Sequence, residues 1–149
     1  MTQPSTSESS RPPKHLRIVG AIALLWNAMG AFDYLMTETR NDAYMRQFSP
    51  EQLAYFYGFP AWVVGSWAIA VWGGVLAAVL LLLRRRQAVP VFLVAFVAMV
   101  VTMVHNYGLA DGLAVAGSPF ALAFSALIVV SGLAFWRYAR AMDRRGLLR

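Results

Sequence analysis

The chain contains no cysteine, and only 13% of its 149 residues are charged. Without thiols it can form neither disulfide bonds nor thiolate metal sites, and no thiol nucleophile is available. Hydrophobic residues make up 59% of the sequence. A soluble domain with one buried core needs a larger polar surface than this composition can supply, so that class of protein is excluded.

Four long apolar stretches occupy most of the chain. Each has about 20 residues, which at the helical rise covers the ~30 Å of hydrocarbon in a bilayer. A segment inside the bilayer must satisfy its own backbone hydrogen bonds, and these stretches lack the alternation that is typical of barrel strands. We therefore expect an all-α integral membrane protein with helices over about 17–36, 60–83, 89–109 and 118–138.

Basic residues gather at alternate ends of these stretches. All but two of the 13 Lys and Arg residues precede the first stretch, join the second to the third, or follow the fourth; Arg40 and Arg46 are the two exceptions. The positive-inside rule then places both termini in the cytoplasm, and it accounts for the net charge of +6 without a nucleic-acid partner. Short connections predict an up-down-up-down four-helix bundle within one membrane domain, residues 14–149.

Two segments outside the apolar stretches have distinct patterns. Residues 1–13 are rich in Ser, Thr and Pro, which predicts a disordered cytoplasmic tail. In the longest external loop, Ser49 followed by Pro50 and Gln52 has the pattern of a capping box, which predicts a short helix over about 50–57. The aromatic residues of this loop predict a lid on the outer face, for which interfacial anchoring is the simpler interpretation.

The second apolar stretch has small residues at four-residue spacing, which would form one stripe on a helix: Ser66, Ala70, Gly74 and Ala78. Such a stripe predicts close helix packing. The packing partner can be a neighbouring helix of the same chain, a second copy in a homo-oligomer, or another membrane protein.

Polar side chains at membrane depth are costly unless they are partnered, so they indicate where a site would lie. Asp33 and His105 each lie 16 residues from the cytoplasmic end of their stretch, which places both about 24 Å above that end. If their helix faces meet, the two side chains would pair. Asn27 lies near the midplane and is expected to hydrogen-bond between helices. The candidate ligand-binding residues are Asn27, Asp33, Ser66, Thr102, His105 and Asn106.

This polar layer has three interpretations. The side chains can satisfy one another or reach interfacial water, or they can line a shallow outward-facing pocket that binds a small solute. The third interpretation is catalysis or cofactor binding. A single membrane histidine is poor evidence for a metal or haem site, so we predict neither metal ligands nor catalytic residues, and the cofactor is unknown.

Four segments within about residues 16–112 carry a family resemblance: Leu25-Trp26-Asn27 with Gly30, residues 33–37, residues 48–60, and the apolar stretch that leads to Arg84-Arg85-Arg86. In these segments the chain resembles small four-span bacterial inner-membrane proteins that are sometimes automatically labelled sugar transporters. This resemblance implies a multi-pass protein of the bacterial inner membrane. The size and span count are also similar to DoxX-type membrane proteins, which would imply a membrane redox component. A further alternative is an accessory subunit of a membrane complex that uses the small-residue stripe.

Overall fold

The computed structural model describes residues 13–116 and 118–149, and every regular element in this part of the chain is a helix. Most of the expected tail, residues 1–12, lies outside the described residues. Four helices are long and apolar enough to cross a membrane, in agreement with the four apolar helices expected from the sequence. They are α1 (Lys14–Glu38), α4 (Ala61–Leu82), α5 (Ala88–Val104) with its π-helical continuation η1 (His105–Leu109), and α7 (Pro119–Arg144).

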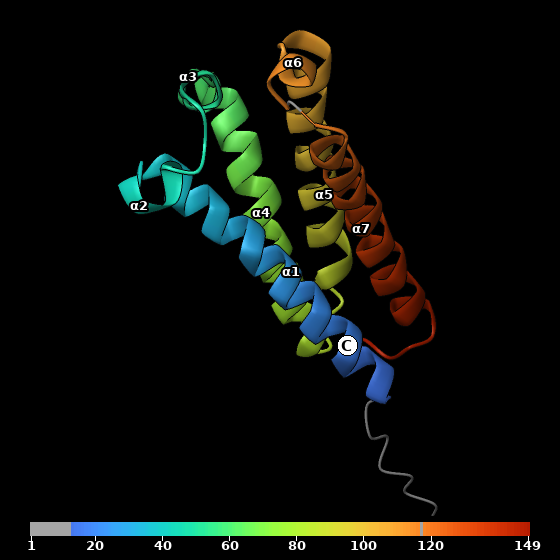
Figure 1. Ribbon diagram of the computed structural model, residues 1–149. Helices are drawn as coiled ribbons and strands as arrows, with labels where there is room; N and C mark the ends of the chain where they lie inside the picture. The colour runs from blue at the N-terminus through green and yellow to red at the C-terminus, as the bar shows by residue number, and fades with distance from the viewer. Residues whose placement is uncertain (1–12, 117) are drawn as a thin grey trace, which may run out of the picture.

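Three short helices gather at one end of the long helices (Figure 1): α2 (Asp42–Met45), α3 (Pro50–Tyr57) and α6 (Gly112–Ala116). The bounds of α3 coincide with the range expected from the sequence. Its capping box is formed because the Ser49 hydroxyl accepts from the Gln52 N–H at 3.2 Å and the Gln52 side chain accepts from the Ser49 N–H at 3.0 Å. The sequence analysis missed α2 and α6, which have only four and five residues.

The long helices pack in chain order. The pair α4 and α5 is central, α1 packs against α4, and α7 packs against α5 (Figure 1). The outer helices α1 and α7 approach each other at Trp26 and Phe124, whose ring centroids are 5.9 Å apart. Because α1 and α7 share no extensive contact in the described part of the chain, a space remains between the long helices near the short ones.

The buried core lies at the opposite end, beside the turn that joins α4 to α5. Large apolar side chains on the outer faces of the helices remain exposed, as expected where lipid replaces water. The core is built from side chains of α1, α4, α5, α7 and the C-terminal segment: Leu16, Ala23, Ala77, Ala78, Leu81, Ala88, Phe92, Ala139, Met142 and Leu148.

The C-terminal segment closes this end of the bundle. After α7 the chain turns at Gly146, whose φ of +68° suits a residue without a side chain. The segment then runs beside the α4–α5 turn, where the Arg86 N–H donates to the Arg149 carbonyl at 2.9 Å and the Arg149 N–H donates to the Arg84 carbonyl at 2.6 Å. Leu148, which precedes Arg149, is 2% exposed.

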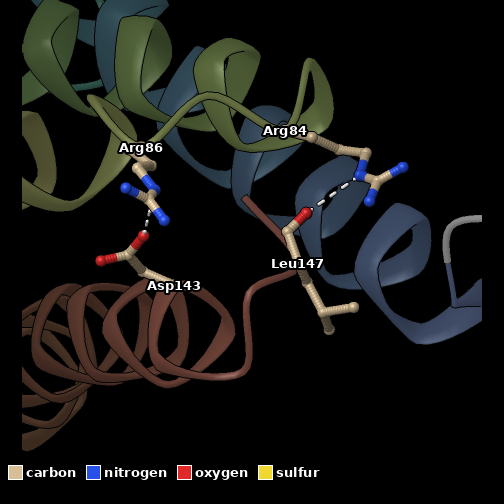
Figure 2. Close-up of polar contacts among 4 residues, drawn as sticks. All are labelled: Arg84, Arg86, Asp143 and Leu147. Atoms are coloured by element: carbon tan, nitrogen blue, oxygen red, sulfur yellow. Dashed lines mark hydrogen bonds and ion pairs between the residues drawn. The ribbon is translucent and has the colours of Figure 1, made fainter. Parts of the chain in front are cut away.

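Side chains of the basic turn reinforce this closure. The Arg84 Nε donates to the Leu147 carbonyl at 3.0 Å, and the Arg86 Nε lies 3.2 Å from Asp143 Oδ1 on α7 (Figure 2). The turn therefore links α4 and α5 to α7 and to the C-terminal segment. This arrangement makes the basic end of the bundle the tightly packed one.

The small-residue stripe is used within the chain. Gly74 and Ala78 are buried, and the Asn27 side chain of α1 lies against Gly74 so closely that a Cβ there would overlap Asn27 Oδ1. Ala70 lies on the wall of the enclosed space, and Ser66 is half-buried. Partner binding through Gly74 and Ala78 would require α1 to separate from α4, so this half of the stripe is not an open docking surface.

Candidate functional site

A cavity of about 970 Å³ lies between the long helices and the three short ones. It extends from α3 and α6 down to Phe92 and Phe135, next to the buried core. This volume is at the upper end of what small-molecule sites have, about 300–1,000 Å³. The fold therefore contains a space large enough for a ligand of drug-like size.

Four of the six candidate ligand-binding residues line this cavity: Asn27, Asp33, Thr102 and Asn106. Two of them have partners on their own helix, since the Asn27 amide donates to the Ala23 carbonyl at 2.8 Å and the Thr102 hydroxyl donates to the Ala98 carbonyl at 3.0 Å. The interhelical hydrogen bond expected for Asn27 is therefore replaced by one within α1. The remaining two candidates, Ser66 and His105, do not line the cavity.

Asp33 is half-buried and binds a tyrosine of the connecting segment. The hydroxyl of Tyr44, on α2, donates to Asp33 Oδ1 at 2.6 Å. Burial, together with the hydrogen bond and the negative charge of Asp33, raises the pKa of Tyr44 to about 12. The phenol consequently remains a proton donor at physiological pH, and it ties α2 to the outer half of α1.

His105 lies against aromatic rings at the start of α4. Its ring packs edge-to-face with Phe59 and Trp62, with centroid distances of 5.7 and 5.3 Å, and its Nδ1 lies 3.3 Å from Asn106 Oδ1. The expected pairing of Asp33 with His105 is not found. Equal depth brings two side chains together only if their helices are neighbours, and here α4 lies between α1 and α5.

Aromatic side chains surround the outer end of the cavity. Successive rings are in contact along this end, with centroid distances from 5.0 Å for Tyr55–Phe59 to 6.5 Å for Phe59–Trp67. Such edge-to-face contacts stabilise a rigid apolar wall. We call this set the aromatic rim; it consists of Phe32, Tyr44, Phe48, Tyr55, Phe56, Phe59 and Trp67.

The sequence predicted a lid on the outer face from these loop aromatics, with interfacial anchoring as the simpler interpretation. Their recurrence through residues 44–59 was the available signal, and the structure places several of these rings in the cavity lining. Tyr107 was missed altogether: its hydroxyl lies 2.6 Å from the Ser125 hydroxyl and links η1 to α7 at the cavity wall.

The short helices are tied to η1 and α6 by hydrogen bonds above the cavity. The Tyr55 hydroxyl donates to the Asn106 carbonyl at 3.3 Å, and the Gln52 amide donates to the Val115 carbonyl at 3.5 Å. Burial, followed by the influence of Tyr107 and Asp111, raises the pKa of Tyr55. Thus α3 lies over the cavity as a roof that is held by uncharged donors.

The charge carried by the described part of the lining is of one sign. Among the described residues, the lining contains one carboxylate, that of Asp33, and no lysine, arginine or histidine. In the same part of the chain no three His, Asp or Glu side chains lie close enough together to hold a metal ion. The arrangement is suited to binding through hydrogen bonds, aromatic contacts and one negative charge.

Comparison of the chain with protein-family models, curated proteins and solved structures gave no match in any of the three. The fold and the cavity therefore define the class of protein on their own. The chain is an all-helical protein with four helices of membrane-spanning length and composition, and these helices enclose a mainly apolar cavity with a polar outer end.

Proposed function

We propose that this chain is a multi-pass protein of the bacterial inner membrane whose cavity binds a small solute from the outer face. The observation that carries the proposal is the cavity of about 970 Å³. Ligand sites in proteins commonly have volumes of about 300–1,000 Å³, so this space is large enough to hold a small solute.

The distribution of basic residues supports the outward orientation. The closed end of the bundle holds the Arg84–Arg86 turn and the last arginines of the chain, whereas the cavity extends to the short helices at the other end. By the positive-inside rule the closed end would face the cytoplasm, with both termini on that side. Each long helix would then cross the membrane in the direction opposite to the one before it.

Cysteine labelling tests this orientation directly, because the natural chain has no cysteine. The variants are Gln47→Cys, between α2 and α3, and Gln87→Cys, in the α4–α5 turn; both positions are exposed. In intact spheroplasts a membrane-impermeant maleimide should label residue 47 and should reach residue 87 only after the membrane is permeabilised. The reverse pattern would overturn the outward-facing assignment.

Binding is supported over catalysis by the character of the lining. Asn27, Asp33, Thr102 and Asn106 contribute polar side chains to the lining of a largely aromatic chamber. Such a set orients a ligand by a few polar contacts while most of the ligand surface is buried against apolar walls. Ser66 and His105 lie outside this lining, so we assign them no direct ligand contact.

Binding of an uncharged probe tests the proposal. The protein in phosphatidylcholine nanodiscs is titrated with N-phenyl-1-naphthylamine, whose fluorescence rises in apolar surroundings, and the signal of empty nanodiscs is subtracted. Saturable binding is expected. A matched pair on α7 localises it: Ala121 lines the cavity, whereas Ala123 is exposed and does not.

The variant Ala121→Trp should abolish saturable binding because the indole fills part of the cavity. Ala123→Trp should bind like the natural chain. Absence of saturable binding, or an equal response of the two variants, would show that the cavity is not the binding site.

A further inference from the structure

Building on the proposed solute site, we infer that the ligands of the cavity are amphiphilic organic cations. The fitting chemistry is a protonated amine or a quaternary ammonium or phosphonium group attached to an apolar body. The charged group lies between Asp33 and the aromatic rim, and the apolar body extends toward the buried core.

The first argument is charge. Asp33 is the sole carboxylate of the described lining, and no basic side chain of that lining neutralises it. Its Oδ1 accepts from Tyr44, while Oδ2 has no hydrogen-bond partner in the described part of the chain. A carboxylate at membrane depth is costly until it is paired. A cationic ligand supplies the missing partner, whereas an anionic ligand would be repelled.

The second argument is the aromatic rim. The faces of aromatic rings carry negative electrostatic potential and attract cations, and aromatic cages bind quaternary ammonium groups in this way. Fourteen residues of the lining are aromatic, and the seven of the rim share the outer end with Asp33. One contact between a cation and an aromatic ring already exists in the structure: the Arg40 guanidinium lies 4.4 Å from the ring centre of Tyr57.

The third argument is the apolar depth of the chamber. Below the rim, the walls consist of Phe92, Phe96, Met99, Ile128 and Phe135. A hydrophilic solute such as a sugar would leave hydroxyls unpaired against these side chains, which costs free energy for each hydroxyl. An amphiphile instead buries its apolar body there and keeps its polar group at the rim.

The fourth argument is access. Leu25 and Met29 of α1 and Phe120 and Phe124 of α7 line the cavity and are exposed rather than packed against neighbouring helices. The cavity therefore borders the hydrocarbon between α1 and α7. An amphiphile dissolved in the outer leaflet can enter sideways through this seam without crossing the polar roof.

Two probes of similar shape and opposite charge test the inference. Tetraphenylphosphonium and tetraphenylborate are each used to displace N-phenyl-1-naphthylamine from the protein in phosphatidylcholine nanodiscs. The phosphonium should displace it at about ten- to hundred-fold lower concentration than the borate, since interactions with a charged group contribute about 1.5–3 kcal/mol.

Asp33→Asn is the diagnostic variant, because the asparagine oxygen can still accept the Tyr44 hydrogen bond. It should weaken phosphonium binding about ten-fold more than it weakens binding of the neutral probe. Glu38→Gln is the matched control, since Glu38 is an exposed acid on the same helix outside the cavity lining. This control should bind both probes like the natural chain.

The outcomes separate the inference from the proposal on which it rests. If the neutral probe still binds and Ala121→Trp still blocks it, but Asp33→Asn leaves phosphonium affinity unchanged, the cation preference is wrong and the solute site stands. Equal weakening by Asp33→Asn and Glu38→Gln would indicate general surface attraction and would also overturn the preference. Loss of neutral-probe binding in the natural chain would overturn the solute site itself.

Discussion

The side chain of Asn27 on α1 packs directly against the backbone of Gly74 on α4, which contributes no side chain of its own to this contact. A Cβ at residue 74 would take the place of Asn27 Oδ1, while the amide nitrogen of Asn27 donates within its own helix. The contact holds α1 against α4 on the wall of the cavity. It is the structural reason for glycine at this position of the small-residue stripe.

Replacing this glycine should therefore destabilise the bundle. We expect Gly74→Ala to lower the free energy of unfolding by about 1–3 kcal/mol, the usual cost of overpacking. Gly65→Ala is the matched control, because a Cβ at residue 65 meets nothing within 4 Å. Thermal unfolding of both variants in the same detergent measures the difference.

A second substitution, at Asn27, should restore part of the stability that Gly74→Ala loses. In Asn27→Ala/Gly74→Ala the smaller side chain of α1 leaves room for the new methyl group, so the double variant should be more stable than Gly74→Ala alone. Additive losses in this cycle would show that the two residues do not contact each other.

The Tyr44 hydroxyl should stabilise the outer half of the bundle. Tyr44→Phe removes the 2.6 Å hydrogen bond to Asp33, and we expect a loss of about 1–3 kcal/mol because the acceptor is a carboxylate. Tyr57→Phe is the control, since the Tyr57 ring contacts Arg40 through its face and this substitution keeps the ring. Equal stability of the two variants in thermal unfolding would contradict the role assigned to Tyr44.

Alkaline pH should lower the stability of the folded chain through the Tyr44 hydroxyl. The pKa of Tyr44 is raised from 10.0 to about 12 in the folded chain, chiefly by burial and then by Asp33. Between these values the unfolded chain has lost the proton and the folded chain retains it, so stability falls as pH rises through this window and is unaffected below it. Unfolding measured across the window should show a smaller fall for Tyr44→Phe than for the natural chain.

The C-terminal segment should contribute to stability through Leu148. Leu148 is 2% exposed within the core at the basic end, whereas Leu83, in the nearby turn, is 63% exposed. We expect Leu148→Ala to cost about 2–4 kcal/mol, the range for a truncated buried leucine, and Leu83→Ala to cost much less. Similar melting temperatures for the two variants would mean that the segment is not docked as described.

Local patterns allowed several features to be predicted. The capping box of Ser49 and Gln52 determines where α3 begins, because both of its hydrogen bonds form within four residues. The stripe of small residues correctly indicated close packing at Gly74. In contrast, the aromatic residues of the loop suggested a lid but not which rings would line a cavity, since that depends on helices that are distant in sequence.

The candidate site was also only partly predictable from the sequence. Asn27, Asp33, Thr102 and Asn106 were found from their cost at membrane depth, and they do line one cavity. His105 has the depth of Asp33 but packs on Trp62 instead. Residue counting gives height along a helix, whereas the direction in which a side chain points depends on which helices are neighbours.

The amino-acid sequence alone determined that the chain is helical and suited to a membrane, because long apolar stretches must satisfy their backbone hydrogen bonds internally wherever lipid replaces water. Only the tertiary structure decided that Tyr44 binds Asp33 and that aromatic rings close over the chamber. Those contacts join segments whose approach is set by the packing of α1, α4, α5 and α7, and no local pattern encodes that packing.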